Sequence, residues 1–138
     1  MNIKIIPGLL STVSQLRKHE NWTRSQLEAS QVNGLKQLRA YAYAHSPFYQ
    51  KFHRGLTDRP LNELPVLTKA MLMEHFDELV TDPSIRLEQV REFAAGDADK
   101  RRYLDRYWVT ATSGSSGHPG FFLFNQPEWI ALIASFAR

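Results

Sequence analysis

The chain has 138 residues, of which 43% are hydrophobic and 22% are charged, and its formal net charge is +3. This is the composition of one ordinary globular domain, and the charge is too small to indicate a nucleic-acid surface. The absence of cysteine excludes a disulfide framework and a thiolate metal site, and it fits a cytoplasmic protein.

Residues 1–20 give no clear element and are expected to form a lead-in segment. Pro7-Gly8 interrupts the apolar residues near the start and Ser11-Thr12 ends them, so the continuous core of a secretory signal is missing. No stretch approaches the roughly 18 apolar residues of a membrane span. We therefore expect neither a targeting segment nor a membrane span.

Residues 21–99 are expected to be mostly helical, beginning with one long helix. Thr23 and Gln26 have the spacing of a capping box, which marks its start. Apolar residues then recur at helical spacing, although Gln31 interrupts them. The recurring positions are Leu27, Gly34 or Leu35, Leu38, Tyr41 or Ala42, and His45.

Ser46-Pro47 predicts the end of this helix and the start of a second, short one. A residue before proline avoids the α region, while serine followed by proline is a common helix start. The second helix is expected to run to about Arg54, with Gly55 terminating it.

The next segment reads as a loop followed by two further helices. Gly55, Pro60 and Pro65 indicate the loop over residues 55–66. Thr68 is a helix cap, and the apolar spacing predicts one helix over 69–80. After a break at 82–84, a weaker pattern predicts a helix over about 84–94.

A basic cluster, Lys100-Arg101-Arg102 with Arg106, precedes the last region of the chain. One interpretation is a solvated loop. The other is a patch that attracts phosphate groups. No recognised nucleic-acid motif accompanies it, so a nucleic-acid partner is not expected.

Residues 100–138 are expected to form a strand, a loop, a strand and a helix. Tyr107–Ala111 and Phe121–Phe124 are apolar and aromatic, and the short connection favours an antiparallel pair. Asn125 with Glu128 then predicts a second capping box and a helix to the chain end.

This final helix has no charged residue from Trp129 to Ala137. A helix that is apolar all round must be buried on every side. The short strands and the other helices are not expected to cover it, so its partners are expected in chain that this sequence lacks. The alternative is self-association through residues 127–138.

Hydroxyl and glycine residues are concentrated between the two strands. Glycine leaves backbone N–H groups bare and hydroxyls add donors, which together suit an anion such as phosphate. An ordinary flexible linker is the alternative. A Walker loop is excluded, because His118-Pro119 follow the last glycine where lysine and Ser or Thr are needed. The candidate phosphate-binding residues are Thr112, Ser113, Gly114, Ser115, Ser116 and Gly117.

Other catalytic patterns are missing from the sequence. The five histidines share no metal-ligand spacing, and Gly114-Ser115-Ser116-Gly117 has the wrong spacing for the nucleophile turn of a hydrolase. His118 lies beside these serines, but no orienting carboxylate pattern accompanies it. A hydrolase is therefore not favoured.

The order of residues 112–119 resembles the phosphate-binding signature of the adenylate-forming enzymes, which include acyl-CoA synthetases, peptide-synthetase adenylation domains and luciferases. The chain matches that signature position by position as Thr-Ser-Gly-Ser-Ser-Gly-His-Pro. It departs at Gly120, where many members carry lysine, which removes one cation from the polyphosphate site.

Two further stretches resemble the phenylacetate–CoA ligase-like branch, which also includes proteins of capsular polysaccharide biosynthesis. They are residues 38–49, Leu-Arg-Ala-Tyr-Ala-Tyr-Ala-His-Ser-Pro-Phe-Tyr, and residues 64–69, Leu-Pro-Val-Leu-Thr-Lys. The three landmarks span about residues 30–130, which corresponds to the first third or so of such an enzyme.

The resemblance implies an α/β fold: a helical N-terminal region and then the start, incomplete here, of the mixed α/β domain of an adenylate-forming enzyme. It implies that a carboxylate reacts with ATP and Mg²⁺ to give an acyl-adenylate, which a thiol such as CoA then accepts. The later motifs of the family cannot be located in this chain, so no ligase activity is expected of it alone. The alternative function is a non-catalytic nucleotide-binding or interaction module.

The aromatic residues near the second helix have two interpretations under this resemblance. They either pack a pair of helices together or form a wall of the acyl pocket, and the sequence does not separate the two. The residues are Tyr41, Tyr43, Phe48, Tyr49 and Phe52.

Overall fold

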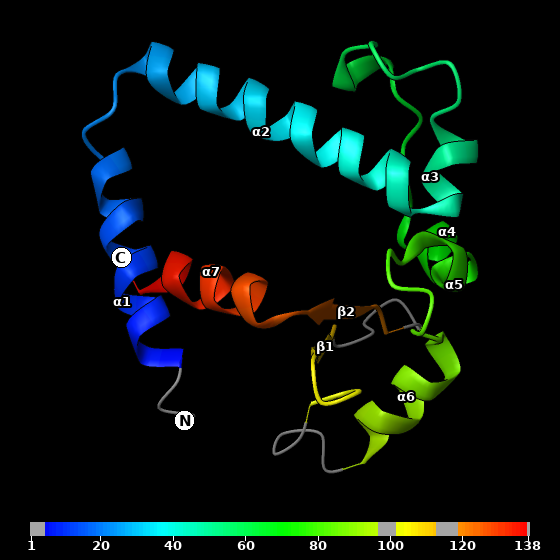
Figure 1. The fold of residues 1–138 in the computed structure, drawn as a ribbon. Helices are drawn as coiled ribbons and strands as arrows, with labels where there is room; N and C mark the ends of the chain where they lie inside the picture. The colour runs from blue at the N-terminus through cyan, green and yellow to red at the C-terminus, as the bar shows by residue number, and fades with distance from the viewer. Residues whose placement is uncertain (1–4, 97–101, 113–118, 138) are drawn as a thin grey trace.

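The computed structural model describes residues 5–96, 102–112 and 119–137. Within them the protein is rich in helix and has one two-stranded antiparallel sheet (Figure 1). None of the helices in these ranges is both long and apolar enough to cross a membrane. The helices are α1 (Ile6–His19), α2 (Arg24–His45), α3 (Pro47–Phe52), the 3-10 helix η2 (Leu61–Glu63), α4 (Lys69–Glu74), α5 (Phe76–Leu79), α6 (Leu87–Ala95) and α7 (Gln126–Phe136), and the strands are β1 (Trp108–Ala111) and β2 (Phe121–Phe124).

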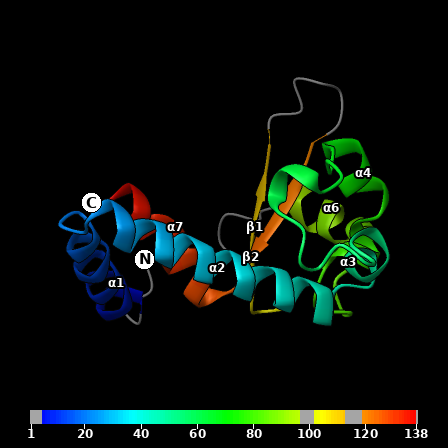
Figure 2. The same ribbon diagram turned by 90° about the horizontal axis from the view of Figure 1, so that it is seen from above.

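The long helix α2 begins where the sequence predicts it. The Thr23 hydroxyl accepts from the Gln26 N–H, and the Gln26 side chain accepts from the Thr23 N–H, so the capping box is confirmed. The helix crosses the molecule from α1 to α3 (Figures 1 and 2). None of its residues is buried. Arg39 holds it to the following loop by donating to the carbonyl oxygens of Leu56 and Arg59.

Ser46 joins three helices at one buried point. It ends α2, and its hydroxyl caps α3 by accepting from the Tyr49 N–H at 3.3 Å. The same hydroxyl donates to the carbonyl oxygen of Glu78 in α5 at 3.2 Å. Ser46 is fully buried, so both polar contacts are made away from water.

The prediction of a single helix over residues 69–80 is wrong, because His75 divides it into α4 and α5. His75 leaves the helical conformation, with φ −106° and ψ 19°, and its ring lies 5.3 Å from that of Phe48. Met73 and Phe76, on either side of the break, both reach the core. Helical spacing continues across the break, so the apolar pattern could not locate it.

The next helix, α6, begins three residues later than predicted, at Leu87. Ser84 is held in a turn, where its N–H and hydroxyl both donate to Asp82 Oδ1. The start of α6 is instead stabilised by Asp77, whose Oδ1 accepts from the Leu87 N–H at 2.8 Å. A cap supplied from another helix leaves no local pattern in the sequence.

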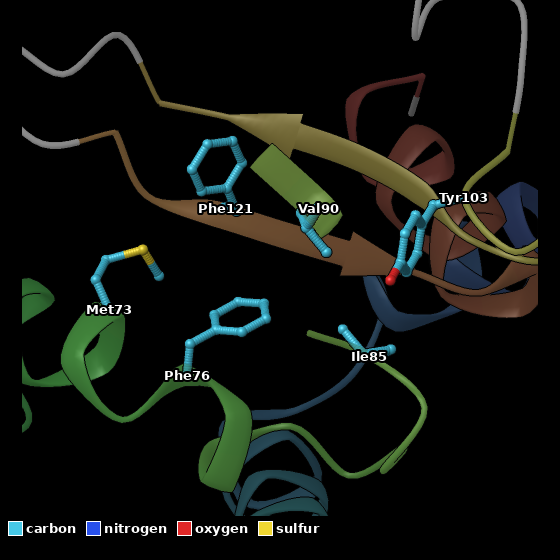
Figure 3. Close-up of a cluster of buried hydrophobic side chains, with 6 residues drawn as sticks. All are labelled: Met73, Phe76, Ile85, Val90, Tyr103 and Phe121. Atoms are coloured by element: carbon cyan, nitrogen blue, oxygen red, sulfur yellow. The ribbon is translucent and has the colours of Figure 1, made fainter. Parts of the chain in front are cut away.

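The sheet and the core confirm the predicted strand pair. β1 and β2 pair antiparallel, with Trp108 opposite Phe124 and Ala111 opposite Phe121. Phe121 projects from β2 into the core (Figure 3). The buried core cluster consists of Met73, Phe76, Ile85, Val90, Tyr103 and Phe121.

The helix pair α1 and α7 lies at the other end of the molecule (Figure 2). Residues 1–20, for which the sequence predicted no element, include α1, and Pro7 is tolerated because it lies in the first turn. A methyl group on Gly8 would lie 3.0 Å from Ile130 Cδ1, so glycine permits the close approach of α1 to α7. The Asn125–Glu128 capping box of α7 is confirmed.

Helix α7 is only partly covered. Ile130 and Ala134 are buried, whereas Phe136 is 82% exposed. Helix α1 therefore supplies cover on one side, which the sequence did not predict. Part of this apolar helix is therefore exposed among the described residues.

We predict that Ser46→Ala lowers the free energy of unfolding by about 1–3 kcal/mol, since it removes a helix cap and leaves buried polar groups without a partner. Urea unfolding followed by circular dichroism measures this. Ser135→Ala is the matched control, because its hydroxyl is exposed and bonds only within its own helix. Equal losses for the two variants would contradict the role of Ser46.

Candidate functional site

The two strands β1 and β2 form a β ribbon. The two ends of the candidate phosphate-binding stretch, Thr112 and Gly120, meet at one end of this ribbon. The Thr112 N–H donates to the Gly120 carbonyl oxygen at 2.9 Å, and the Gly120 N–H donates to Thr112 Oγ1 at 2.8 Å. This pair continues the β1–β2 register by one step beyond Ala111 and Phe121. Thr112 is exposed and its hydroxyl still has a proton to donate, while Gly120 is buried.

Thr112 is the one predicted phosphate-binding residue that lies among the described residues. Ser113, Gly114, Ser115, Ser116 and Gly117 lie outside the described residues, as does His118. Pro119 is exposed. The described geometry therefore fixes where the stretch leaves and rejoins the ribbon.

Lys69 is a neighbour of this site that sequence reasoning placed at the start of a helix and in the family-like stretch 64–69, without connecting it to residues 112–120. A methyl group on Gly120 would lie 3.2 Å from Lys69 Cε, 3.4 Å from Thr112 Oγ1 and 3.6 Å from a ring carbon of Phe122. The side chain of Lys69 thus occupies space that a side chain at position 120 would need. The three residues come from α4, β2 and the residue after β1, so their proximity depends on the tertiary fold.

A pocket of about 420 Å³ lies beside the ribbon, between β2 and the C-terminal part of α2. The walls include Tyr41, Tyr49, Phe122 and Phe124. The sequence left open whether the aromatic residues near the second helix pack helices together or line a pocket, and the structure shows some of them doing each. Tyr41 and Tyr49 line the pocket, whereas Phe48 is buried and stacks on Phe52 with ring centroids 4.9 Å apart.

Two carboxylates, Asp82 and Glu128, also line this pocket. Asp82 accepts hydrogen bonds from Ser84 and, at 2.7 Å, from the Tyr107 hydroxyl, and Arg106 lies 3.2 Å away. These contacts, those with Ser84 and Tyr107 first, lower the pKa of Asp82 to about 2. Burial first, and then Asp82, raises the pKa of Tyr107. The pocket wall is therefore mostly apolar but includes the Asp82 carboxylate, which is negatively charged at neutral pH.

The described part of the basic cluster makes local contacts. The Arg102 guanidinium lies over the Trp108 ring at 5.0 Å, and Arg106 contacts Asp82 and the Tyr107 ring. These contacts favour a structural role for both side chains. Lys100 and Arg101 lie outside the described residues.

The described residues include no group of three or more His, Asp or Glu side chains that could hold a metal ion. A Mg²⁺ ion accompanying a nucleotide is held largely by phosphate oxygens and water, so a dedicated protein cage is not required. No protein-family model, curated protein or solved structure matches this chain.

We predict that Asp82 makes the stability of the protein depend on acid pH. Its folded pKa of about 2 is below the ordinary 3.8, so its contribution is complete above pH 4 and is lost as the pH falls through about 2. Asp82→Asn should therefore be less stable than the wild type by about 1–2 kcal/mol at pH 7, with the difference vanishing near pH 2.

Urea unfolding at a series of pH values tests this prediction. Asp58→Asn is the control, since Asp58 is exposed and forms no ion pair or hydrogen bond among the described residues. A difference between wild type and Asp82→Asn that is the same at pH 2 and pH 7 would show that the charge of Asp82 is not what stabilises this turn.

Proposed function

We propose that the stretch from Thr112 to Gly120 binds the polyphosphate of ATP, and that the chain is the N-terminal part of an adenylate-forming ligase similar to phenylacetate–CoA ligase. The observation that carries the proposal is the closing pair between Thr112 and Gly120. It holds the two ends of a serine- and glycine-rich stretch together at the end of an antiparallel ribbon. A sequence rich in backbone amides and hydroxyls between two such joined ends suits a multiply charged anion.

The chemistry of the donors favours phosphate over other anions. Thr112 offers a hydroxyl proton, and the sequence adds Ser113, Ser115 and Ser116 between the two ends. Each charge-assisted hydrogen bond to an ionised oxygen contributes about 1.5–3 kcal/mol, so three or four of them are enough for measurable binding. ATP, with Mg²⁺ on its phosphates, activates a carboxylate in this class of reaction, and CoA or another thiol is the proposed acceptor.

The aromatic pocket is not part of the proposed carboxylate site. Asp82 is ionised at neutral pH and Glu128 lines the same pocket, so a carboxylate substrate would meet negative charge there. The apolar walls suit apolar side chains instead. We propose that the uncovered surfaces of α2 and α7 pack against the rest of such an enzyme or a second copy of the chain, and that the protein acts in the cytoplasm.

We predict that the purified chain binds ATP–Mg²⁺ saturably in calorimetry and that inorganic tripolyphosphate competes for the site. Replacing Ser113, Ser115 and Ser116 together with alanine should weaken binding at least tenfold, since hydroxyl donors to phosphate are lost. The matched control replaces Ser11, Ser14 and Ser30, three exposed serines of α1 and α2, with alanine. Equal affinities of the two triple variants would contradict the proposed site.

We predict that the same purified chain shows no carboxylate-dependent exchange of pyrophosphate into ATP, even when ATP binds. The ribose-binding and C-terminal motifs that the family implies for this step cannot be located in the sequence. The measurement uses labelled pyrophosphate with a panel of aromatic and aliphatic carboxylates. Exchange with any of them would show that this chain is a ligase on its own. Binding without exchange fits both the proposed enzyme fragment and a non-catalytic module, and adding the missing part of the enzyme separates these two.

A further inference from the structure

The pocket between β2 and the C-terminal part of α2 has walls that combine aromatic rings with carboxylates. Its volume of about 420 Å³ falls within the range of small-molecule sites, roughly 300–1,000 Å³. Phe76 and Phe121 contribute to the wall from the buried core, whereas Tyr41 is 54% exposed and Phe122 is 42% exposed. A ligand with an apolar group would therefore cover ring surface that now meets water.

The charged side chains that line this pocket are negative. Asp82 and Glu128 belong to the lining, and none of the described lining residues is lysine, arginine or histidine. Arg106 offsets the charge of Asp82 from outside the lining, at 3.2 Å, and the ring of His45 lies 4.5 Å from that of Tyr41. Glu128 forms no ion pair with any residue that the structure describes. The pocket therefore has one carboxylate without a described cationic partner.

The cap of α7 holds this carboxylate in place. Glu128 Oε2 accepts from the Asn125 N–H at 2.8 Å, while Oε1 accepts no hydrogen bond from a described residue. Burial first, then Asp82 and, more weakly, Glu128 raise the pKa of Tyr107, whereas Arg106 lowers it. Both carboxylates thus lie near the same phenol, and Glu128 keeps one oxygen free to accept a hydrogen bond.

We propose that this pocket binds a small organic cation that carries an aromatic or branched apolar group, of which an arylalkylammonium ion is the simplest case. The apolar group displaces water from the aromatic walls, and the ammonium group donates to the free oxygen of Glu128. Aromatic rings such as that of Tyr41 also attract cations. The inference goes beyond the proposed function, because the pocket contains none of the predicted phosphate-binding residues.

A purely structural explanation of the same residues makes a different prediction. In that case Asp82 only stabilises its turn, Glu128 only caps α7, and the pocket is a gap lined by apolar side chains. Such a gap would bind apolar compounds according to the area they bury, whatever their charge. Our proposal expects binding to depend on the sign of the charge.

The experiment titrates the intact chain with three ligands of similar shape: phenethylammonium, the neutral phenethyl alcohol and the carboxylate hydrocinnamate. Amide chemical shifts in proton–nitrogen NMR spectra give each Kd and locate the ligand. Phenethylammonium is expected to shift the amides of Thr81, Leu123 and Asn125, which line the pocket. It is expected to bind about threefold more tightly than the alcohol and about tenfold more tightly than the carboxylate.

A pair of matched variants tests the charge. Glu128→Gln removes it and keeps a side chain that can complete a capping box. This variant is expected to raise the Kd of phenethylammonium about threefold and to leave that of the alcohol unchanged. Glu88→Gln is the control, because Glu88 also lies in the first turn of a helix, α6, but does not line this pocket.

A second pair tests the cavity itself. Ala42→Phe adds a ring to the pocket wall from α2 and is expected to prevent binding of both the ammonium ion and the alcohol. Ala40→Phe is the control, since Ala40 is exposed in the same helix and lies outside the lining. Circular dichroism and thermal unfolding establish that each variant is folded. If Ala42→Phe does not fold, the Glu128 and Glu88 variants still decide the proposal.

The outcomes are distinct from those of the proposed function. Equal Kd values for the three ligands, or equal effects of Glu128→Gln and Glu88→Gln, would contradict a cation site. Phenethylammonium that shifts no amide of the pocket would contradict it as well. None of these results bears on ATP binding, and a failure of the chain to bind ATP–Mg²⁺ would leave the cation site standing.

Discussion

The pairing of β1 with β2 determines where the two ends of the candidate site, Thr112 and Gly120, lie. Four residue pairs bring the strands into register, and the Thr112–Gly120 pair adds one further step at the loop end. One face of the ribbon, through Phe121, is buried in the core with α4, α5 and α6. The core thereby fixes the orientation of the ribbon, and this orientation brings Gly120 against the side chain of Lys69.

The opposite face of the ribbon connects the core to the α1–α7 pair. Trp108 stacks on Trp129 of α7 with ring centroids 5.7 Å apart and an angle of 5° between the planes. Phe124 contacts the same indole from the ribbon, and Arg102 covers the Trp108 ring. Aromatic contacts of this kind are stronger than burial alone, so a ribbon of two short strands can join two groups of helices.

The sequence predicted the features that depend on neighbouring residues. The capping boxes at Thr23 and Asn125, the double role of Ser46, and the strand pair are all written within a few positions of the chain. It did not predict the cap that Asp77 gives to Leu87, the break at His75, or the approach of Lys69 to Gly120. These depend on segments that meet only in the folded chain, and no local pattern encodes them.

Helix α2 is held with little burial of its apolar side chains among the described residues. An isolated helix is marginally stable in water, and most helices are held by burying an apolar face. Yet α2 buries none of its 22 residues, and Val32, Leu38 and Tyr41 are each more than half exposed. Its capping box and the exposed Arg24–Glu28 pair together contribute only about 1–2 kcal/mol. Burying these three side chains would add roughly 1.5–3 kcal/mol each. A surface that covered these three side chains would therefore stabilise α2 more than its local contacts do.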